Sequence, residues 1–241
     1  MSEKRTALVI SAHAADFVWR CGEAIALHQQ LGYEVTVVCL SFGERGESAK
    51  LWKQGGMTLD RVKAARRREA EDAAAELGAH DIRFLDLGDY PLELDREARF
   101  RLVDIIREVQ PGWMMSHSKW NPYNTDHMYA TQVALECRMI AQAWGHNPGQ
   151  KVLGAPQLYL FEPHQTEQMG WKPDVFLDIT PVWEKARCDR VHGGSAAPVG
   201  VLHESRPEPG QPFPPQFGRA GRRAECGIRG RIPVGLSADG G

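Results

Sequence analysis

The stretch that decides the fold class is residues 6–16, TALVISAHAAD. Its apolar beginning predicts a buried strand over residues 6–11. His13 and Asp16 follow, three positions apart, where the chain turns from strand to helix, so an imidazole and a carboxylate can point at one spot. A strand that runs into a helix in this way predicts an α/β protein, in which ligands bind beyond the carboxyl ends of the strands.

Strand and helix patterns alternate along the rest of the chain. Further strands are predicted at residues 33–40, 81–87, 113–116, 157–161 and 175–179. Helices are predicted at residues 17–31, 58–77, 95–109 and 127–144, with Thr58 and Asp95 as N-terminal caps and with Gly32 and Gly78 after helix ends. This alternation and the apolar strands predict a Rossmann-like α/β fold, with a mainly parallel sheet covered by helices on both faces.

Bulk composition narrows the class of protein and its partners. A chain of 241 residues, 42% hydrophobic and 25% charged, fits one sizeable soluble domain. A net charge of −2 gives no reason to expect nucleic acid or a membrane surface as a partner, and no apolar run approaches the roughly 20 residues that cross a bilayer. Five scattered cysteines without a CxxC pair, and no secretory leader before the first strand, favour a cytoplasmic location.

Residues 188–241 differ from the rest of the chain. They are rich in Gly, Pro and Arg and carry almost no helical or strand period. One interpretation is a disordered tail. The other is a shifted reading frame, since a frame shift in GC-rich DNA yields these residue types. We therefore predict a catalytic domain at residues 1–187 and a tail with little structure at residues 188–241.

A second polar element, Asn124-Thr125-Asp126-His127, follows the strand predicted at 113–116. Since parallel strands end at one edge of a sheet, His13, Asp16 and His127 form a three-ligand set for a catalytic metal with one open position. Two imidazoles and one carboxylate suit zinc and are also used by non-haem iron. Asp126 can either orient a ligand histidine or cap the helix that follows, and the sequence leaves both roles open.

On these motifs the chain resembles the LmbE-like, or PIG-L, family of zinc-dependent deacetylases. That family carries Ala-His-Pro-Asp-Asp after its first strand and His-Pro-Asp-His later, which stand here as residues 12–16 and 124–127. Residues 66–69, followed by Leu77-Gly78, are similar to the family's Arg-x-x-Glu helix. The resemblance covers residues 5 to 185 and implies a Zn2+ ion held by His13, Asp16 and His127.

Two departures from the family pattern bear on the reaction. The family's general base is here Ala15, and the first histidine of its second motif, which assists the tetrahedral intermediate, is here Asn124. Alanine cannot transfer a proton and asparagine does so poorly. The chain therefore keeps the implied metal ligands but lacks the residues that transfer protons in the deacetylases. A zinc-dependent N-deacetylase or amidase with a relocated base, for instance Glu47, is the alternative.

With these two departures the chain resembles one branch of the family, the bacterial 4-oxalomesaconate hydratases of gallate and protocatechuate breakdown. The similarity rests on residues 13–20 (HAADFVWR), 43–48 (GERGES) and 161–165 (FEPHQ). It implies a hydro-lyase that adds water to 4-oxalomesaconate and gives 4-carboxy-4-hydroxy-2-oxoadipate. Its partner would be a small polycarboxylate. The oligomeric state stays open, with a homo-oligomer as one alternative.

Hydration of a double bond conjugated to a carbonyl requires a general acid and a general base beside the metal. We expect Glu47, in the glycine-bearing loop after the second strand, and His164, after the fifth strand, to fill these two roles, in an order that the sequence does not fix. Glu44 and His117 are weaker alternatives.

A substrate with several carboxylates also requires fixed cations, and a guanidinium binds a carboxylate through two hydrogen bonds. Arg20, Arg45, Arg67 and Lys119 are predicted near the rim of the site. We expect Arg45, Arg67 and Lys119, together with Asn124, to contact the substrate.

Overall fold

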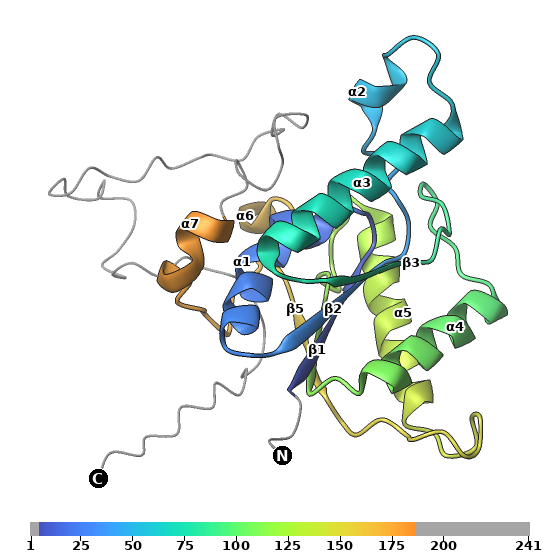
Figure 1. Ribbon diagram of the computed structural model, residues 1–241, viewed down its shortest axis with the longest axis vertical. Helices are drawn as coiled ribbons and strands as arrows, with labels where there is room; N and C mark the ends of the chain where they lie inside the picture. The colour runs from blue at the N-terminus through green and yellow to red at the C-terminus, as the bar shows by residue number, and fades with distance from the viewer. Residues whose placement is uncertain (1–4, 187–241) are drawn as a thin grey trace, which may run out of the picture.

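The computed structural model describes residues 5–186, and the tail predicted at residues 188–241 lies outside this part of the chain. Five strands form the centre, with these bounds: β1 (Thr6–Ser11), β2 (Glu34–Cys39), β3 (Asp81–Phe84), β4 (Trp113–Ser116) and β5 (Gln157–Leu160). The helices are α1 (Asp16–Gln30), α2 (Ala49–Trp52), α3 (Leu59–Leu77), α4 (Arg96–Val109), α5 (Thr125–Ala141), α6 (Thr166–Met169) and α7 (Trp183–Ala186), shown in Figure 1.

All five strands pair in parallel, in the order β3-β2-β1-β4-β5. The first strand is central, with Leu8 opposite Thr36 on one side and Met114 on the other. Parallel pairing brings the carboxyl ends of all five strands to one edge, so the residues that follow each strand are close to one another. The predicted parallel sheet is confirmed.

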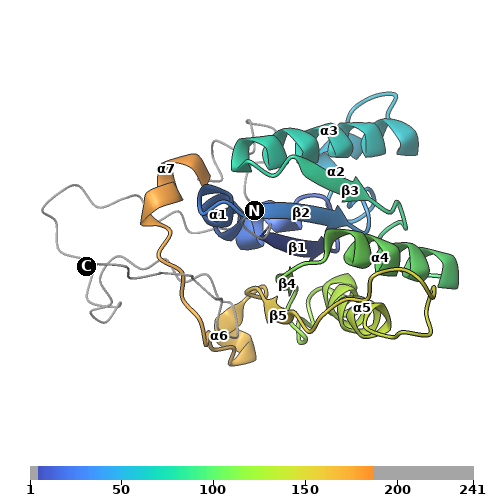
Figure 2. The ribbon, with the colours of Figure 1, turned by 60° about the horizontal axis from the view of Figure 1, so that its bottom comes forward.

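Helices cover both faces of the sheet. Successive side chains of a strand point to opposite faces, so Ala7 and Val9 pack against α1 and α3 while Leu8 and Ile10 pack against α4 and α5. Figure 2 shows these layers, with α1, α3 and α7 on one side of the strands and α4 and α5 on the other. The residues of β1 from Ala7 to Ile10 are fully buried, which fixes the strand that carries the first functional motif.

Thr58 and Asp95 cap the N-termini of α3 and α4, as predicted. The side chain of Thr58 accepts a hydrogen bond from the backbone N–H of Arg61, and that of Asp95 accepts one from Ala98 at 2.7 Å. The next helix, α5, begins two residues earlier than predicted because Asn124 is its cap. The Asn124 side-chain oxygen accepts from the N–H of Asp126 at 3.2 Å, which places Asp126 and His127 inside the first turn.

The strand predicted at residues 175–179 is wrong, because none of the described strands includes these residues. Leu177 and Ile179 are buried in the core beside α1, and Val175 packs against it from the same face. Of these residues only Val175 forms a β-bridge. Apolar side chains at every second position therefore bury one side of this segment although it is not a continuous strand.

Among residues 5–186, no helix is long and apolar enough to span a bilayer. The three cysteines of this part, Cys21, Cys39 and Cys137, are buried free thiols.

Candidate active site

Four side chains from three connections meet at the carboxyl edge of the sheet. His13 follows β1, Asp16 begins α1, Glu47 lies in the loop after β2, and His127 lies in the first turn of α5. One ligand atom of each side chain lies within 4.8 Å of the others. We call these four residues the metal cluster. The structure therefore brings together the three predicted ligands and one of the two predicted proton-transfer residues.

The contacts within the metal cluster are short. Nδ1 of His13 lies 2.9 Å from Oδ2 of Asp16 and 3.3 Å from Oε1 of Glu47. Nε2 of His127 lies 3.3 Å from Oδ1 of Asp16. Within the described residues that Nε2 atom is buried and has no hydrogen-bond partner. An unpartnered imidazole nitrogen aimed at a carboxylate, among further nitrogen and oxygen donors, fits a divalent metal ion.

Asp16 is held as a buried anion by the surrounding histidines. Burial alone would raise its pKa, but His127, His13 and His117 together keep the pKa of this carboxyl well below its usual value. The backbone N–H of His13 also donates to Oδ2 of Asp16 at 2.9 Å. A buried carboxylate that stays ionised needs such compensation, and its negative charge makes it a strong ligand for a cation.

Asp126 fixes the orientation of His13 from the side away from Asp16. Its carboxylate lies 3.3 Å from Nε2 of His13 and accepts hydrogen bonds from the backbone N–H groups of Tyr90 at 2.9 Å and Leu92 at 3.1 Å. A carboxylate on the second ring nitrogen of a ligand histidine sets its tautomer and ring direction. Of the two roles left open for Asp126, the structure thus shows contact with a candidate ligand histidine, while Asn124 caps the helix.

The loop that carries Glu47 is anchored by a further buried carboxylate, that of Asp89. It accepts from the backbone N–H of Arg45 at 2.8 Å and of Gly46 at 2.7 Å. Arg66, buried on α3, donates to the backbone oxygen of Phe42 at 3.3 Å and has its guanidinium 3.8 Å from Glu47. Burial and the nearby Asp16 raise the pKa of Glu47, although His13 and Arg66 oppose this rise. Glu47 is therefore a fixed carboxyl group with an environment suited to proton exchange.

Tyr90 joins this loop to the metal cluster. Its ring stacks on His13 with a centroid separation of 5.9 Å and an interplanar angle of 12°. Its hydroxyl accepts a hydrogen bond from the side-chain nitrogen of Asn124 at 3.0 Å. A Cβ atom added at Gly46 would lie 1.9 Å from Cε2 of Tyr90, so the ring occupies the space that any larger residue at position 46 would need.

Three polar residues complete the site on the side of β4 and β5. His117 stacks on His127 at 4.0 Å, and its Nε2 accepts from the backbone N–H of Ala12 at 2.9 Å. The ring of His164 also stacks on that of His127, with a centroid separation of 5.3 Å. Burial, with help from the charges of Arg20 and His127, lowers the pKa of His164 to about 4. The amide of Asn121 lies between His127 and His164.

The structure does not bring Arg67 to the metal cluster. Its guanidinium lies over the rings of Phe42 and Phe84, at 5.1 and 4.5 Å, and pairs with Glu71 at 3.6 Å. One residue advances a helix by about 100°, so the neighbouring Arg66, and not Arg67, faces Glu47. Arg45 keeps a position at the rim, since it is exposed and its guanidinium donates to the backbone oxygen of Asp89 at 2.7 Å.

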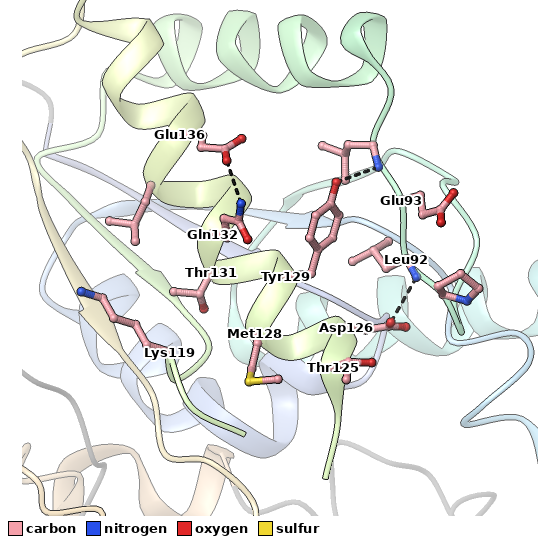
Figure 3. Close-up of a pocket in the computed structure, with 13 residues that line it drawn as sticks. Leu92, Glu93, Lys119, Thr125, Asp126, Met128, Tyr129, Thr131, Gln132 and Glu136 are labelled. Carbon is pink, nitrogen blue, oxygen red and sulfur yellow. Dashed lines mark hydrogen bonds between the residues drawn. The ribbon is translucent and has the colours of Figure 1, made fainter. Parts of the chain in front are cut away.

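Lys119 and Asn124, also predicted to contact the substrate, lie in different surroundings, and these contacts stay predictions. Lys119 is exposed and lines a pocket of about 980 Å³ on the outer side of α5, together with Leu92, Asp126 and Gln132 among others. Figure 3 shows Lys119 and Asp126 on opposite sides of the beginning of α5. Both ends of the Asn124 amide form hydrogen bonds, since its oxygen accepts from the N–H of Asp126 and its nitrogen donates to the hydroxyl of Tyr90.

Sequence reasoning missed Asp89, Tyr90 and Asn121 as parts of the site. A signal for them was present, because residues 85–92 follow β3 and residues 117–124 follow β4 at the same carboxyl edge. Applying the edge rule to every strand, and not only to those followed by His-Asp motifs, would have marked both segments.

A family model described as "PIG-L: GlcNAc-PI de-N-acetylase" matches residues 8–138, and the chain belongs to this family. The resemblance seen in the motifs is thereby confirmed. The matched residues include all four members of the metal cluster.

Two matches from Pseudomonas putida strain KT2440, one of sequence and one of structure, are similar to the chain over most of its length. It is 59% identical over 182 residues to a protein named "4-oxalmesaconate hydratase", which covers 76% of this chain and 70% of that protein. The crystal structure of "GalB, the 4-carboxy-2-hydroxymuconate hydratase" from strain KT2440 matches with a TM-score of 0.76 and 57% identity, over 79% of this chain and 80% of that one.

A deacetylase structure is also similar. N,N'-diacetylchitobiose deacetylase from Pyrococcus horikoshii matches with a TM-score of 0.66 and 28% identity, over 79% of this chain and 70% of that one. The fold is therefore shared by proteins named for hydration and by proteins named for deacetylation, and the site residues must distinguish the two reactions.

Proposed function

We propose that this protein is a zinc-dependent hydratase that adds water to a carbon–carbon double bond of 4-oxalomesaconate. The observation that carries the proposal is the complete metal cluster, including Glu47, in a chain 59% identical to a protein named as a hydratase of this substrate. The position of the family's deacetylase base is occupied by Ala15, which has no group for proton transfer. The substrate names in the two P. putida matches, 4-oxalmesaconate and 4-carboxy-2-hydroxymuconate, describe keto and enol forms of one tricarboxylate skeleton.

His13, Asp16 and His127 are the residues that would hold the zinc ion. Two imidazoles and one carboxylate are a donor set that would suit a catalytic zinc ion. When bound there, zinc supplies a Lewis acid that polarises an oxygen of the substrate. Asp126 keeps Nδ1 of His13 directed at the site by engaging its Nε2 atom.

Glu47 and His164 supply the base and the acid. Addition of water breaks one O–H bond, forms a C–O bond and places a proton on the neighbouring carbon, so one group takes a proton while the other gives one. Glu47 approaches from the loop after β2 and His164 from the end of β5. Since the connections after β2 and β5 leave the same edge of the parallel sheet, we expect both side chains to reach one substrate.

Arginine side chains provide the positive charge that a tricarboxylate needs. Arg20 lies one helical turn after Asp16 on α1, close enough to His164 to contribute to its lowered pKa, after the larger effect of burial. We propose that Arg20 and the rim residue Arg45 bind substrate carboxylates, and that Arg66 acts by holding Glu47.

The test of this function is an ultraviolet assay of 4-oxalomesaconate hydration by the full-length protein. We expect turnover that disappears on dialysis against a chelator and returns with one equivalent of zinc. An N-acetylglucosamine derivative, assayed in parallel, should remain acetylated. Stoichiometric zinc without hydration would contradict the proposal, and release of acetate would favour the deacetylase alternative.

Replacing Gly46 with alanine should lower kcat/KM for hydration by about 100-fold, because the added Cβ displaces either Tyr90 or the loop of Glu47, and an error of 1 Å in a reacting group can cost that much. The matched control is Gly55→Ala, in the same connection, where an added Cβ meets nothing within 4 Å. Equal activities of the two variants would show that the contact between Gly46 and Tyr90 does not position Glu47.

We also propose a cytoplasmic location, a small polycarboxylate as the partner, and no interaction with nucleic acid or membrane. The three buried free thiols of the described residues suit a reducing compartment. The net charge of −2 supports the absence of a nucleic-acid partner.

A further inference from the structure

Asn121 lies between two histidines of the site in the segment after β4. One end of its amide, placed as nitrogen, is 3.0 Å from Nδ1 of His127 and 3.4 Å from Nδ1 of His164. The other end, placed as oxygen, is buried and accepts no hydrogen bond within the described residues. The whole side chain is only 1% exposed. A buried amide in contact with two functional histidines must affect their hydrogen-bonding states.

The two ends of an amide have the same shape, so hydrogen-bond partners decide which end is oxygen. If nitrogen faces the two histidines, it donates to Nδ1 of each, and each neutral ring must then carry its proton on Nε2. A protonated Nε2 on His127 cannot bind a metal ion. Yet this is the atom that lies 3.3 Å from Asp16 and has no hydrogen-bond partner among the described residues.

The reverse orientation removes this conflict. With oxygen toward the histidines, its two lone pairs accept from Nδ1–H of His127 and from Nδ1–H of His164. The two rings lie nearly parallel, at an interplanar angle of 18°, which suits a single shared acceptor. Nε2 of His127 is then a free lone pair directed at the metal cluster.

We propose that Asn121 is a positioning residue whose side-chain oxygen holds both His127 and His164 in the Nδ1-protonated tautomer. His127 thereby presents Nε2 to the metal, and His164 presents Nε2 to the reacting substrate. The inference rests on the proposed function in one respect, since it takes the metal cluster to bind zinc. It assigns to Asn121 the role that Asp126 has for His13, with an amide in place of a carboxylate.

Two variants test the role of the oxygen. Asn121→Leu removes both polar atoms at similar size, and Asn121→Asp keeps an acceptor at the same place. Loss of such a partner of a ligand histidine costs 10–100-fold in metal affinity, so we expect that loss for the leucine variant in a competition with a fluorescent chelator. The aspartate variant should stay within about threefold of the wild-type affinity, since a carboxylate accepts both N–H groups.

The matched control is Gln132→Leu, which removes an exposed amide from the outer side of α5 that donates to Glu136. It should leave zinc affinity unchanged. Wild-type affinity in the Asn121→Leu variant, or an equal loss in the leucine and aspartate variants, would overturn the inference.

A measurement on the wild-type protein keeps the inference testable if the leucine variant does not fold. Ring ¹⁵N shifts of the zinc-loaded protein should show protonated Nδ1 and unprotonated Nε2 for both His127 and His164. A protonated Nε2 with an unprotonated Nδ1 on His164 would overturn the shared acceptor. If the wild-type protein takes up no zinc, the proposed function fails together with this inference. If it binds zinc tightly and only the Asn121 results differ, this inference alone fails.

Discussion

Replacing Glu47 with glutamine is expected to lower kcat for hydration by a factor of about 10² to 10⁴, the range that a general acid or base contributes. Glutamine keeps the size of the side chain but cannot exchange a proton at neutral pH. The zinc-loaded variant should be compared with wild type in steady-state kinetics. Because His13, Asp16 and His127 remain, zinc content should stay at one equivalent, which separates a loss of proton transfer from a loss of metal.

The matched control for this change is Glu44→Gln in the same loop. Glu44 is also buried, but its carboxylate accepts from the backbone N–H of Phe42 at 3.2 Å and lies 3.8 Å from Lys63, away from the metal cluster. We expect the Glu44 variant to keep activity within a few-fold of wild type. Full activity of the Glu47 variant, or an equal loss in both, would remove Glu47 from the mechanism.

Replacing Asp126 with asparagine should weaken zinc binding by about 10–100-fold, the usual cost of losing the partner of a ligand histidine. The free energy of unfolding of the metal-free protein should also fall by about 1–3 kcal/mol, because one buried backbone N–H loses its acceptor. In the wild-type protein three donors share the Asp126 carboxylate, namely His13 Nε2 and the N–H groups of Tyr90 and Leu92. Chelator competition and urea unfolding measure the two effects separately.

Asp95→Asn is the control for the Asp126 variant. Asp95 caps α4 at an exposed position and accepts from Ala98 at 2.7 Å. Asparagine caps a helix about as well as aspartate, so stability should change by only a few tenths of a kcal/mol and zinc affinity should not change. If the Asp126 variant behaves like this control, Asp126 does not orient His13.

The fold was predictable because its signals are local. The apolar runs of β1 and β4 and the caps Thr58 and Asp95 each act within a few residues, and alternation of strand and helix leaves few topologies. The prediction was wrong at residues 175–179, where Leu177 and Ile179 bury one face of an extended segment. Periodicity reports which side of a segment is buried and does not report whether its backbone pairs.

The site was predictable where a motif stands directly after a strand, as with His13, Asp16 and His127. Glu47 was placed correctly at the carboxyl edge, because the loop after β2 must end there. Arg67 and Arg66 could not be told apart, since the phase of a helix depends on how α3 packs. The edge rule would have marked the segment of Asp89 and Tyr90, but their contacts with Gly46 and Asp126 could not be predicted, because these contacts join segments that are far apart in the sequence.

The arrangement of the functional side chains on five separate connections has a consequence for how such enzymes diversify. The core side chains of β1, β2 and β4 lie between two helical layers, while Glu47, Tyr90 and Asn121 lie in segments beyond the strand ends. During evolution one connection can therefore change and give a new reaction while the sheet and its helices keep their free energy of unfolding. For protein engineers, the exposed position 45 in the segment from Ser41 to Ser48 can be varied without redesigning the sheet, whereas Phe42 belongs to the core and Gly46 has no room for a side chain.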